Sequence, residues 1–146
     1  MTKPIPKPLN ESTDNGSNVE RIKDISNYLR GTLVESFANP LTSSISDDDH
    51  QLIKFHGTYE QDDRDRRQER QDRKLEPAYE FMIRARVPGG DLTAAQWQAV
   101  DQISDQYGNQ TFRLTTRQAV QFHGIIKFEL KQTIQAMDKA LMDSIA

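Results

Sequence analysis

Strict alternation of apolar and polar residues marks a β-strand at residues 79–87, YEFMIRARV. In a strand, successive side chains point to opposite faces, so one parity packs on a core and the other does not. The apolar parity holds Phe81, Ile83, Ala85 and Val87. The opposite parity carries Arg84 and Arg86, and the PGG that follows at 88–90 predicts the end of the strand.

A second alternating stretch covers residues 112–124, FRLTTRQAVQFHG. Its even positions are mostly apolar, with Phe112, Leu114 and Phe122 among them. We predict one continuous strand with an apolar back and a polar front. The odd positions that form this front are Arg113, Thr115, Arg117, Ala119, Gln121 and His123.

Helical patterns separate and follow the two strands. Thr93 and Gln96 fit a capping box for a helix that runs to Tyr107, with Gly108 as its C-cap. A last helix is predicted at about 131–145. The order strand, helix, strand, helix predicts an α+β fold, a ferredoxin-like half-domain (β-α-β-α) over residues 78–146. We expect its two strands to pair in parallel through the helical crossover. Because the sequence stops inside a helical pattern, we also expect the half-domain to be truncated at its C-terminus.

The first half of the chain is more polar and is predicted to form an extended, partly disordered N-terminal arm. Residues 1–18 contain Pro, Ser, Asn and Gly and are predicted to be a disordered tail. In the segment 19–77, we expect a short helix near 19–29, a loop over 39–50 and a strand or extended stretch over 51–61. The charged run 60–76 is predicted to be solvated and partly helical, or to lie against a partner.

Composition narrows the class of protein. The 146 residues carry a net charge of −3, which argues against a nucleic-acid-binding protein. There is no cysteine, so this chain forms neither disulfides nor thiolate metal sites. The three histidines show no metal-ligand spacing, and we predict no metal site. No apolar run approaches the roughly 20 residues of a membrane span, and no signal peptide is evident. We therefore predict a cytoplasmic protein without membrane contacts.

Four arginines on the polar faces indicate the chemistry of a site. If the two strands pair, Arg84, Arg86, Arg113 and Arg117 share one face. Guanidinium groups so placed repel one another unless an anion lies among them, and each can bind a carboxylate or phosphate through two donors. The strip therefore predicts a polyanionic ligand that lies across the sheet.

Four segments carry a resemblance to a known family. RLTTRQAVQFHG (113–124) resembles the siroheme-contacting strand of assimilatory sulfite and nitrite reductases, and FMIRARVPGG (81–90) resembles the strand with the substrate arginine. SNYLRGT (26–32) and IKFHGTYEQDDRD (53–65) are similar to N-terminal segments of the hemoprotein (beta) subunit of NADPH-dependent sulfite reductase. The four motifs occur in the family's order.

The resemblance implies an oxidoreductase of sulfate assimilation and cysteine biosynthesis. Such an enzyme reduces sulfite to sulfide with six electrons, at a siroheme coupled to a [4Fe-4S] cluster, with NADPH as donor through a flavoprotein (alpha) partner. Residues 19–77 would include the partner-docking segment, and Arg84 would bind sulfite. The implied siroheme contacts are Arg113, Thr115, Thr116, Arg117, Gln121 and His123.

The resemblance also has limits that leave alternatives open. Thr116 stands where the family often has Asn. The cysteines that bind the family's cluster are absent from this chain, so we expect the isolated chain to be inactive. The alternatives are a fragment of a ferredoxin-dependent sulfite or nitrite reductase, a non-catalytic module that docks on a partner, and an unstable piece without a function of its own.

Overall fold

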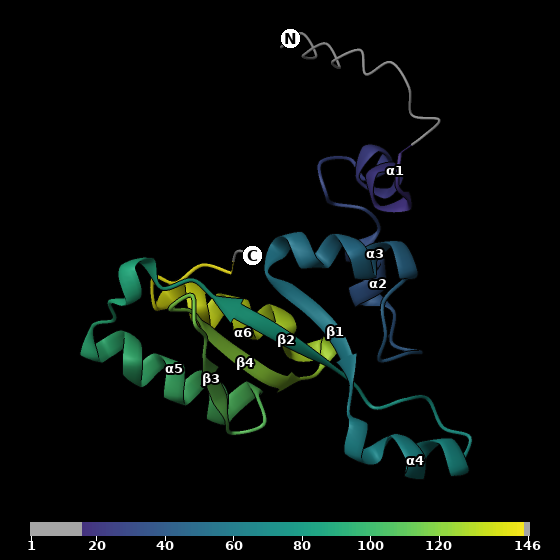
Figure 1. The fold of residues 1–146 in the computed structure, drawn as a ribbon. Helices are drawn as coiled ribbons and strands as arrows, with labels where there is room; N and C mark the ends of the chain where they lie inside the picture. Colours follow the sequence, from purple (N-terminus) through teal and green to yellow (C-terminus); the bar gives the residue numbers. More distant parts are fainter. Residues whose placement is uncertain (1–15, 145–146) are drawn as a thin grey trace, which may run out of the picture.

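A computed structural model describes residues 16–144 of the chain (Figure 1). Its α-helices are α1 (Asn18–Ile25), α2 (Leu33–Ala38), α3 (Asp47–Leu52), α4 (Arg64–Asp72), α5 (Ala94–Tyr107) and α6 (Leu130–Lys139). Its strands are β1 (Thr58–Asp62), β2 (Tyr79–Ala85), β3 (Phe112–Leu114) and β4 (Val120–Ile125). Short turns of 3₁₀ type are η2 (Ile53–His56), η3 (Pro88–Gly90) and η4 (Lys127–Glu129).

The strands form one sheet in the order β1-β2-β4-β3, and every neighbouring pair is antiparallel. This mixture of helices with a four-stranded sheet confirms the α+β class. The predicted side-by-side parallel pair is wrong. β3, which follows the α5 crossover, does run in the same direction as β2, but β4 lies between them. The unit is therefore a split β-α-β arrangement.

The predicted continuous strand at 112–124 is instead a hairpin, β3 and β4 joined by residues 115–119. The amide of Gln118 donates to the carbonyl oxygen of Thr115 at 3.0 Å, and Gln118 has a left-handed backbone with φ of 58°. That conformation reverses the chain. The turn contains neither Gly nor Asn, the residues that usually mark such a position.

The core lies on one face of the sheet, as the alternation predicted. Phe81, Ile83 and Phe122 are fully buried there, together with Val100 of α5 and Met137 of α6. The helix at α5 begins with the predicted capping box between Thr93 and Gln96. Gly108 follows it in an extended conformation, and a side chain there would meet the carbonyl oxygen of His123 at 2.9 Å. The close approach of β4 therefore requires this glycine.

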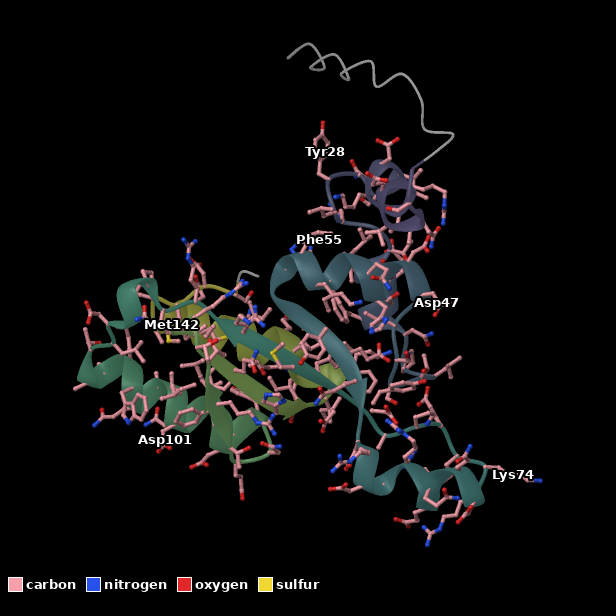
Figure 2. The ribbon with its side chains drawn as sticks, in the orientation of Figure 1. Tyr28, Asp47, Phe55, Lys74, Asp101 and Met142 are labelled. Atoms are coloured by element: carbon pink, nitrogen blue, oxygen red, sulfur yellow. The ribbon has the colours of Figure 1, made fainter. Side chains whose placement is uncertain are left out.

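The N-terminal segment is more ordered than an extended arm. The helix near 19–29 is present as α1, but the loop predicted over 39–50 is wrong at 47–50, where α3 begins. The strand predicted over 51–61 is wrong at 51–56, where the end of α3 and the 3₁₀ turn η2 lie. Its last part is present as β1, which pairs with β2. Asn27, Tyr28 and Leu29 all have left-handed backbones, and Figure 2 shows the Tyr28 side chain pointing away from the body. Of the predicted tail, residues 1–15 lie outside the described residues, whereas Ser17 caps α1.

The last helix, α6, ends at Lys139 rather than near 145. Leu141 has a φ of 58°, and its side chain is exposed. The next residues turn back to the sheet, where the amide of Arg86 donates to the carbonyl oxygen of Asp143 at 2.8 Å and Ser144 bridges to Ala85. The apolar pattern at 131–145 therefore spans two structures, a helix and a short strand-like return. Ile145, which the pattern included, lies outside the described residues.

Lys127 ties the N-terminal segment to the sheet. Its ammonium group is buried and donates to three carbonyl oxygens, those of Ser36, Asn39 and Ser44, at 3.2, 2.8 and 3.0 Å. All three donors of a lysine are thereby used. By contrast, α4 projects from the body and contains no buried residue (Figure 1). Across residues 16–144, none of the helices combines the length and apolar character needed to cross a bilayer.

Candidate functional site

A row of polar side chains crosses the face of the sheet opposite the core. Arg84 of β2 is paired in register with Gln121 of β4, and Gln121 is paired with Arg113 of β3. Since neighbouring strands lie about 5 Å apart, the two arginine α-carbons are about 10 Å apart with Gln121 between them. The structure thus places three of the predicted site residues side by side.

The turn between β3 and β4 preserves this row although it was not foreseen. In the hairpin, Leu114 pairs with Val120 and Arg113 pairs with Gln121. The five turn residues are an odd number, so odd positions of β3 meet odd positions of β4. The polar parity therefore remains on one face. Of the apolar parity, Phe122 lies in the core and Phe112 packs against it, whereas Leu114 is exposed.

A pocket of about 420 Å³ opens at the end of β2, next to this row. Three arginines line the pocket. Arg84 lies in β2, Arg86 directly follows the last residue of β2, and Arg117 lies in the hairpin turn. No carboxylate is among the residues that line it, which include Gly89 and Gln118. Three guanidinium groups without an acidic partner around one cavity are suited to an oxyanion.

The other predicted contacts take different places. The hydroxyl group of Thr115 accepts from the amide of Ala119 at 3.2 Å, so Thr115 stabilises the turn itself. Thr116 is exposed on the turn and is not among the residues that line the pocket. Arg113 is exposed at the edge of the sheet. Of these predicted residues, Arg84 and Arg117 line the pocket. Arg113 lies in the row across the sheet, and Thr116 lies neither in the row nor at the pocket.

His123 lies two residues beyond Gln121 on the same face and is 8% exposed. It is followed by a bulge, where β4 gains a residue relative to β2 and Gly124 has a φ of 75°. A side chain at Gly124 would meet Asn109 at 2.6 Å, so glycine is required there. The bulge turns Ile125 back to the core and leaves His123 on the polar face.

Two buried nitrogen atoms of this face have no hydrogen-bond partner in the part of the chain that the structure describes. They are Nε of Arg84 and Nε2 of His123. A buried polar atom without a partner costs about 1–3 kcal/mol, and such atoms are rare in folded proteins. Both nitrogens can donate to an acceptor that lies over the face, which fits a ligand rich in carboxylates.

Burial lowers the pKa of His123, and the positive charge of Arg113 lowers it further, from an ordinary value of 6.5. His123 is consequently neutral at pH 7 when no anion lies on this face. An anion near Arg113 would offset part of the arginine charge and raise the pKa of His123.

We expect NMR titration of the His123 ring to show a midpoint below 6.5 in the free chain. The midpoint should rise when a polycarboxylate such as uroporphyrin is added, because the added negative charge favours the imidazolium. Since the folded-state pKa is depressed, the folded protein should lose stability as pH falls below about 6.5, where the unfolded state takes up the proton first. The variant His123→Gln assigns the signal and should abolish this part of the pH dependence. A midpoint at or above 6.5 in the free chain would contradict the burial and charge of this site.

Sequence reasoning missed two contributors to the pocket. Arg86 was counted among the arginines but received no role, and Gln118 was placed on the apolar parity of a continuous strand. A signal was present for the second residue, because Thr116 and Gln118 are polar where the alternation requires apolar side chains. Two such interruptions in succession indicate a turn.

Comparisons with known proteins agree with this fold. Residues 73–140 match the model of the nitrite/sulfite reductase ferredoxin-like half domain. Sulfite reductase [NADPH] hemoprotein beta-components of Shouchella clausii and Staphylococcus haemolyticus are 60% and 58% identical to the chain over 130 and 128 residues. These matches cover 89% and 88% of the chain but only 23% and 22% of the relatives.

A solved structure shows the same arrangement. The Mycobacterium tuberculosis NirA protein superposes with a TM-score of 0.69 at 26% identity, over 88% of this chain and 25% of that one. The chain thus spans about a quarter of the length of the proteins that it matches. Within that span, the chain belongs to the nitrite/sulfite reductase family and is homologous to the hemoprotein beta-components of NADPH sulfite reductase.

Proposed function

We propose that this chain forms part of the substrate and cofactor site of an assimilatory NADPH sulfite reductase. The observation that carries the proposal is the row Arg84–Gln121–Arg113, with two unpartnered buried nitrogens on the same face. The name of these relatives supports sulfite as the substrate and NADPH as the source of electrons. The protein would act in the cytoplasm.

Siroheme is the cofactor that the family resemblance implies, and it fits the chemistry of this face. It carries eight carboxylates, and Arg113 and Arg117 would pair with some of them. Gln121 and His123 would donate neutral hydrogen bonds, the second from its unpartnered Nε2. Thr115 and Thr116 would contribute hydroxyl groups from the turn. When bound, siroheme coupled to a [4Fe-4S] cluster supplies the electrons.

Arg84 would hold the substrate. Its guanidinium group is positively charged and planar, and it can donate two parallel hydrogen bonds to the oxygens of sulfite. Its backbone is fixed on both sides, because its amide donates to the carbonyl oxygen of Gly57 at 2.8 Å and it is paired with Gln121 in the sheet. A fixed positive charge near the departing oxygens would stabilise the negative charge that they acquire.

The residues of this chain do not fit the [4Fe-4S] cluster. Such clusters are held by cysteine thiolates, and the chain has no cysteine. The ligands of the cluster would therefore come from outside these 146 residues. A flavoprotein partner is also part of the proposal, supported by the designation of the relatives as a beta-component. The segment 19–77 would contribute to docking that partner.

The purified 146-residue chain should not oxidise reduced methyl viologen in the presence of sulfite, because it cannot hold the cluster. Sulfite-dependent oxidation by the isolated chain would contradict this prediction.

A chimera tests the proposed function directly. In it, the matching segment of the Shouchella clausii hemoprotein is replaced by this chain, which is 60% identical there. We expect the chimera to bind siroheme and to reduce sulfite, and to accept electrons from NADPH when the flavoprotein partner is added. A chimera that folds and binds siroheme but reduces only nitrite, or accepts electrons only from ferredoxin, would overturn the assignment.

A further inference from the structure

Gln118 adopts a backbone conformation that glycine would adopt at lower cost. Gln118 lies near the end of the hairpin turn and has a φ of 58°. Its amide donates to the carbonyl oxygen of Thr115. Thr115 is also bonded to Ala119, through its amide to the carbonyl oxygen and through its hydroxyl group from the amide. Turns of this kind usually place Gly or Asn at such a position. A strained non-glycine residue next to a binding site indicates that its side chain has a function there.

The Gln118 side chain lies against Gly90. A Cβ atom at Gly90 would be 3.1 Å from Cδ of Gln118 and 3.3 Å from its Cβ and Cγ. Gly90 itself has a φ of 77°. The absent side chain of Gly90 thus makes room for Gln118, and the contact joins the turn after β2 to the turn between β3 and β4.

These two turns carry opposite walls of the arginine pocket. Arg84 and Arg86 precede the turn at 88–90, and Arg117 immediately precedes Gln118. Both Gln118 and Gly89 line the pocket, whose volume is about 420 Å³. The contact between Gln118 and Gly90 therefore fixes the separation between Arg117 and the two arginines of the β2 side.

We propose that Gln118 is a positioning residue that holds the three guanidinium groups of this pocket at the spacing needed to bind one oxyanion together. This role of Gln118 rests on the proposed function, because the oxyanion is either sulfite or a carboxylate of the tetrapyrrole. This role explains the strained backbone at Gln118, because its side chain keeps Arg117 apart from Arg84 and Arg86 when no anion is bound. Two arginines that could approach or separate freely would share an anion less well.

The experiment compares Gln118→Gly with Gln110→Gly in the 146-residue chain. Gln110 has a φ of 64° and is exposed in a different turn, so its substitution relieves similar backbone strain and removes the same side chain outside the pocket. The probes are sulfite and uroporphyrin, an octacarboxylate. Affinity is measured from chemical shifts of the arginine Nε–H groups and from uroporphyrin absorbance, and stability is measured by urea unfolding.

We expect both variants to unfold at the same or a higher urea concentration than the wild type. Gln118→Gly alone should weaken binding of the oxyanion about 10-fold, and the Arg117 Nε–H signal should shift in the free protein. Gln118→Met, which keeps the packing on Gly90, should restore most of the affinity. Weakening with sulfite only would identify the substrate as the oxyanion, and weakening with uroporphyrin only would identify a cofactor carboxylate.

Two results would overturn the role of Gln118 and leave the proposed function intact. In one, Gln118→Gly binds both probes as the wild type does, while Arg117→Ala and Arg84→Gln lose binding. In the other, Gln118→Gly loses stability relative to Gln110→Gly, which would make Gln118 a structural residue. If the wild-type chain binds neither probe, or binds them independently of Arg84 and Arg117, the anion site of the proposed function fails and the inference fails with it.

Discussion

Replacement of Arg84 by glutamine is expected to lower kcat/KM for sulfite at least about 100-fold in the chimeric reductase. Glutamine retains much of the length and polarity of arginine but removes the positive charge and the forked pair of donors. Arg84 is fixed by its register with Gln121 and by the bond from its amide to Gly57, so the variant should leave the sheet unchanged. Sulfite reduction with reduced methyl viologen measures the effect.

Controls separate loss of substrate binding from loss of the cofactor. Arg84→Lys keeps the charge without the fork and should lie between the wild type and Arg84→Gln. Arg66→Gln removes an exposed charge on the projecting helix α4 and should leave kcat/KM unchanged. Siroheme content, read from visible absorption, should be similar in all variants. Unchanged kcat/KM in Arg84→Gln with full siroheme would remove Arg84 from the substrate site.

The polar strip was predictable because the sheet preserves parity. Alternation alone assigned Arg84, Gln121 and Arg113 to one face, and an odd-numbered turn kept them there. The strand that pairs with β2 was not predicted, because the turn lacks the Gly or Asn that usually marks a reversal, and the polar residues Thr116 and Gln118 were not interpreted as a break in the strand. Consequently, the face was predicted correctly and the strand order was not.

The N-terminal segment was less predictable because hydrogen bonds of buried polar side chains hold it in addition to apolar packing. Lys127 is buried on three carbonyl oxygens, a position that no hydropathy pattern assigns to a lysine. The left-handed backbones at 27–29 are likewise invisible in the residue types. Since hydrogen bonds between distant residues contribute to this part of the fold, a sequence pattern could predict its helix α1 but not the way in which the segment packs.

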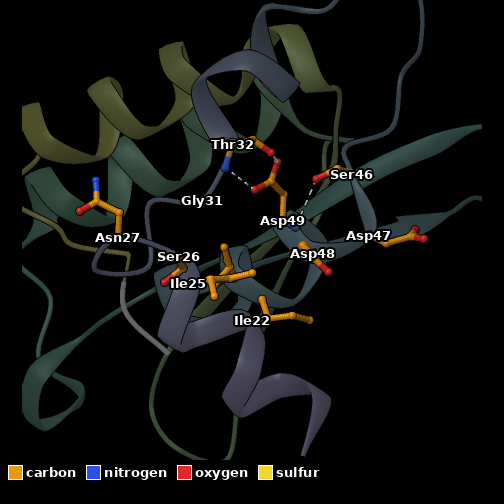
Figure 3. A pocket seen from close by; sticks show the side chains of 11 residues that line it. Ile22, Ile25, Ser26, Asn27, Gly31, Thr32, Ser46, Asp47, Asp48 and Asp49 are labelled. Carbon is orange, nitrogen blue, oxygen red and sulfur yellow. Dashed lines mark hydrogen bonds between the residues drawn. The ribbon is translucent and has the colours of Figure 1, made fainter. Parts of the chain in front are cut away.

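Asp49 is the clearest case of such a hydrogen-bonded centre. Its carboxylate is fully buried and accepts from the amide and hydroxyl groups of Thr32 at 2.9 and 2.7 Å (Figure 3). It also accepts from the hydroxyl group of Ser36. A Cβ atom added at Gly31 would lie only 2.6 Å from Oδ1 of Asp49. The carboxylate therefore joins α3 to the start of α2, and only a glycine at 31 leaves room for it.

Asp49→Ala is expected to lower the free energy of unfolding by about 3 kcal/mol or more, because it leaves a buried amide and two hydroxyl groups without their acceptor. Asp49→Asn keeps one acceptor oxygen and should cost about 1–2 kcal/mol. Urea unfolding at pH 7 measures both. Asp48→Asn is the matched control, because Asp48 is the exposed neighbour in the same helix and should have no effect.

The pH dependence tests the charge of Asp49 separately. Burial raises the pKa of Asp49, but the hydrogen bonds from Ser36, Thr32 and Ser46 together outweigh burial and hold the pKa below its ordinary value of 3.8. A carboxylate whose folded-state pKa is depressed stabilises the fold above its unfolded-state pKa, and this stabilisation disappears as pH falls through the lower value. The difference in unfolding free energy between the wild type and Asp49→Asn should therefore be constant from pH 7 to about 5 and shrink below about pH 4. A difference that is the same at pH 7 and pH 3, or an Asp49→Ala variant as stable as the wild type, would show that the carboxylate does not hold α2 and α3 together.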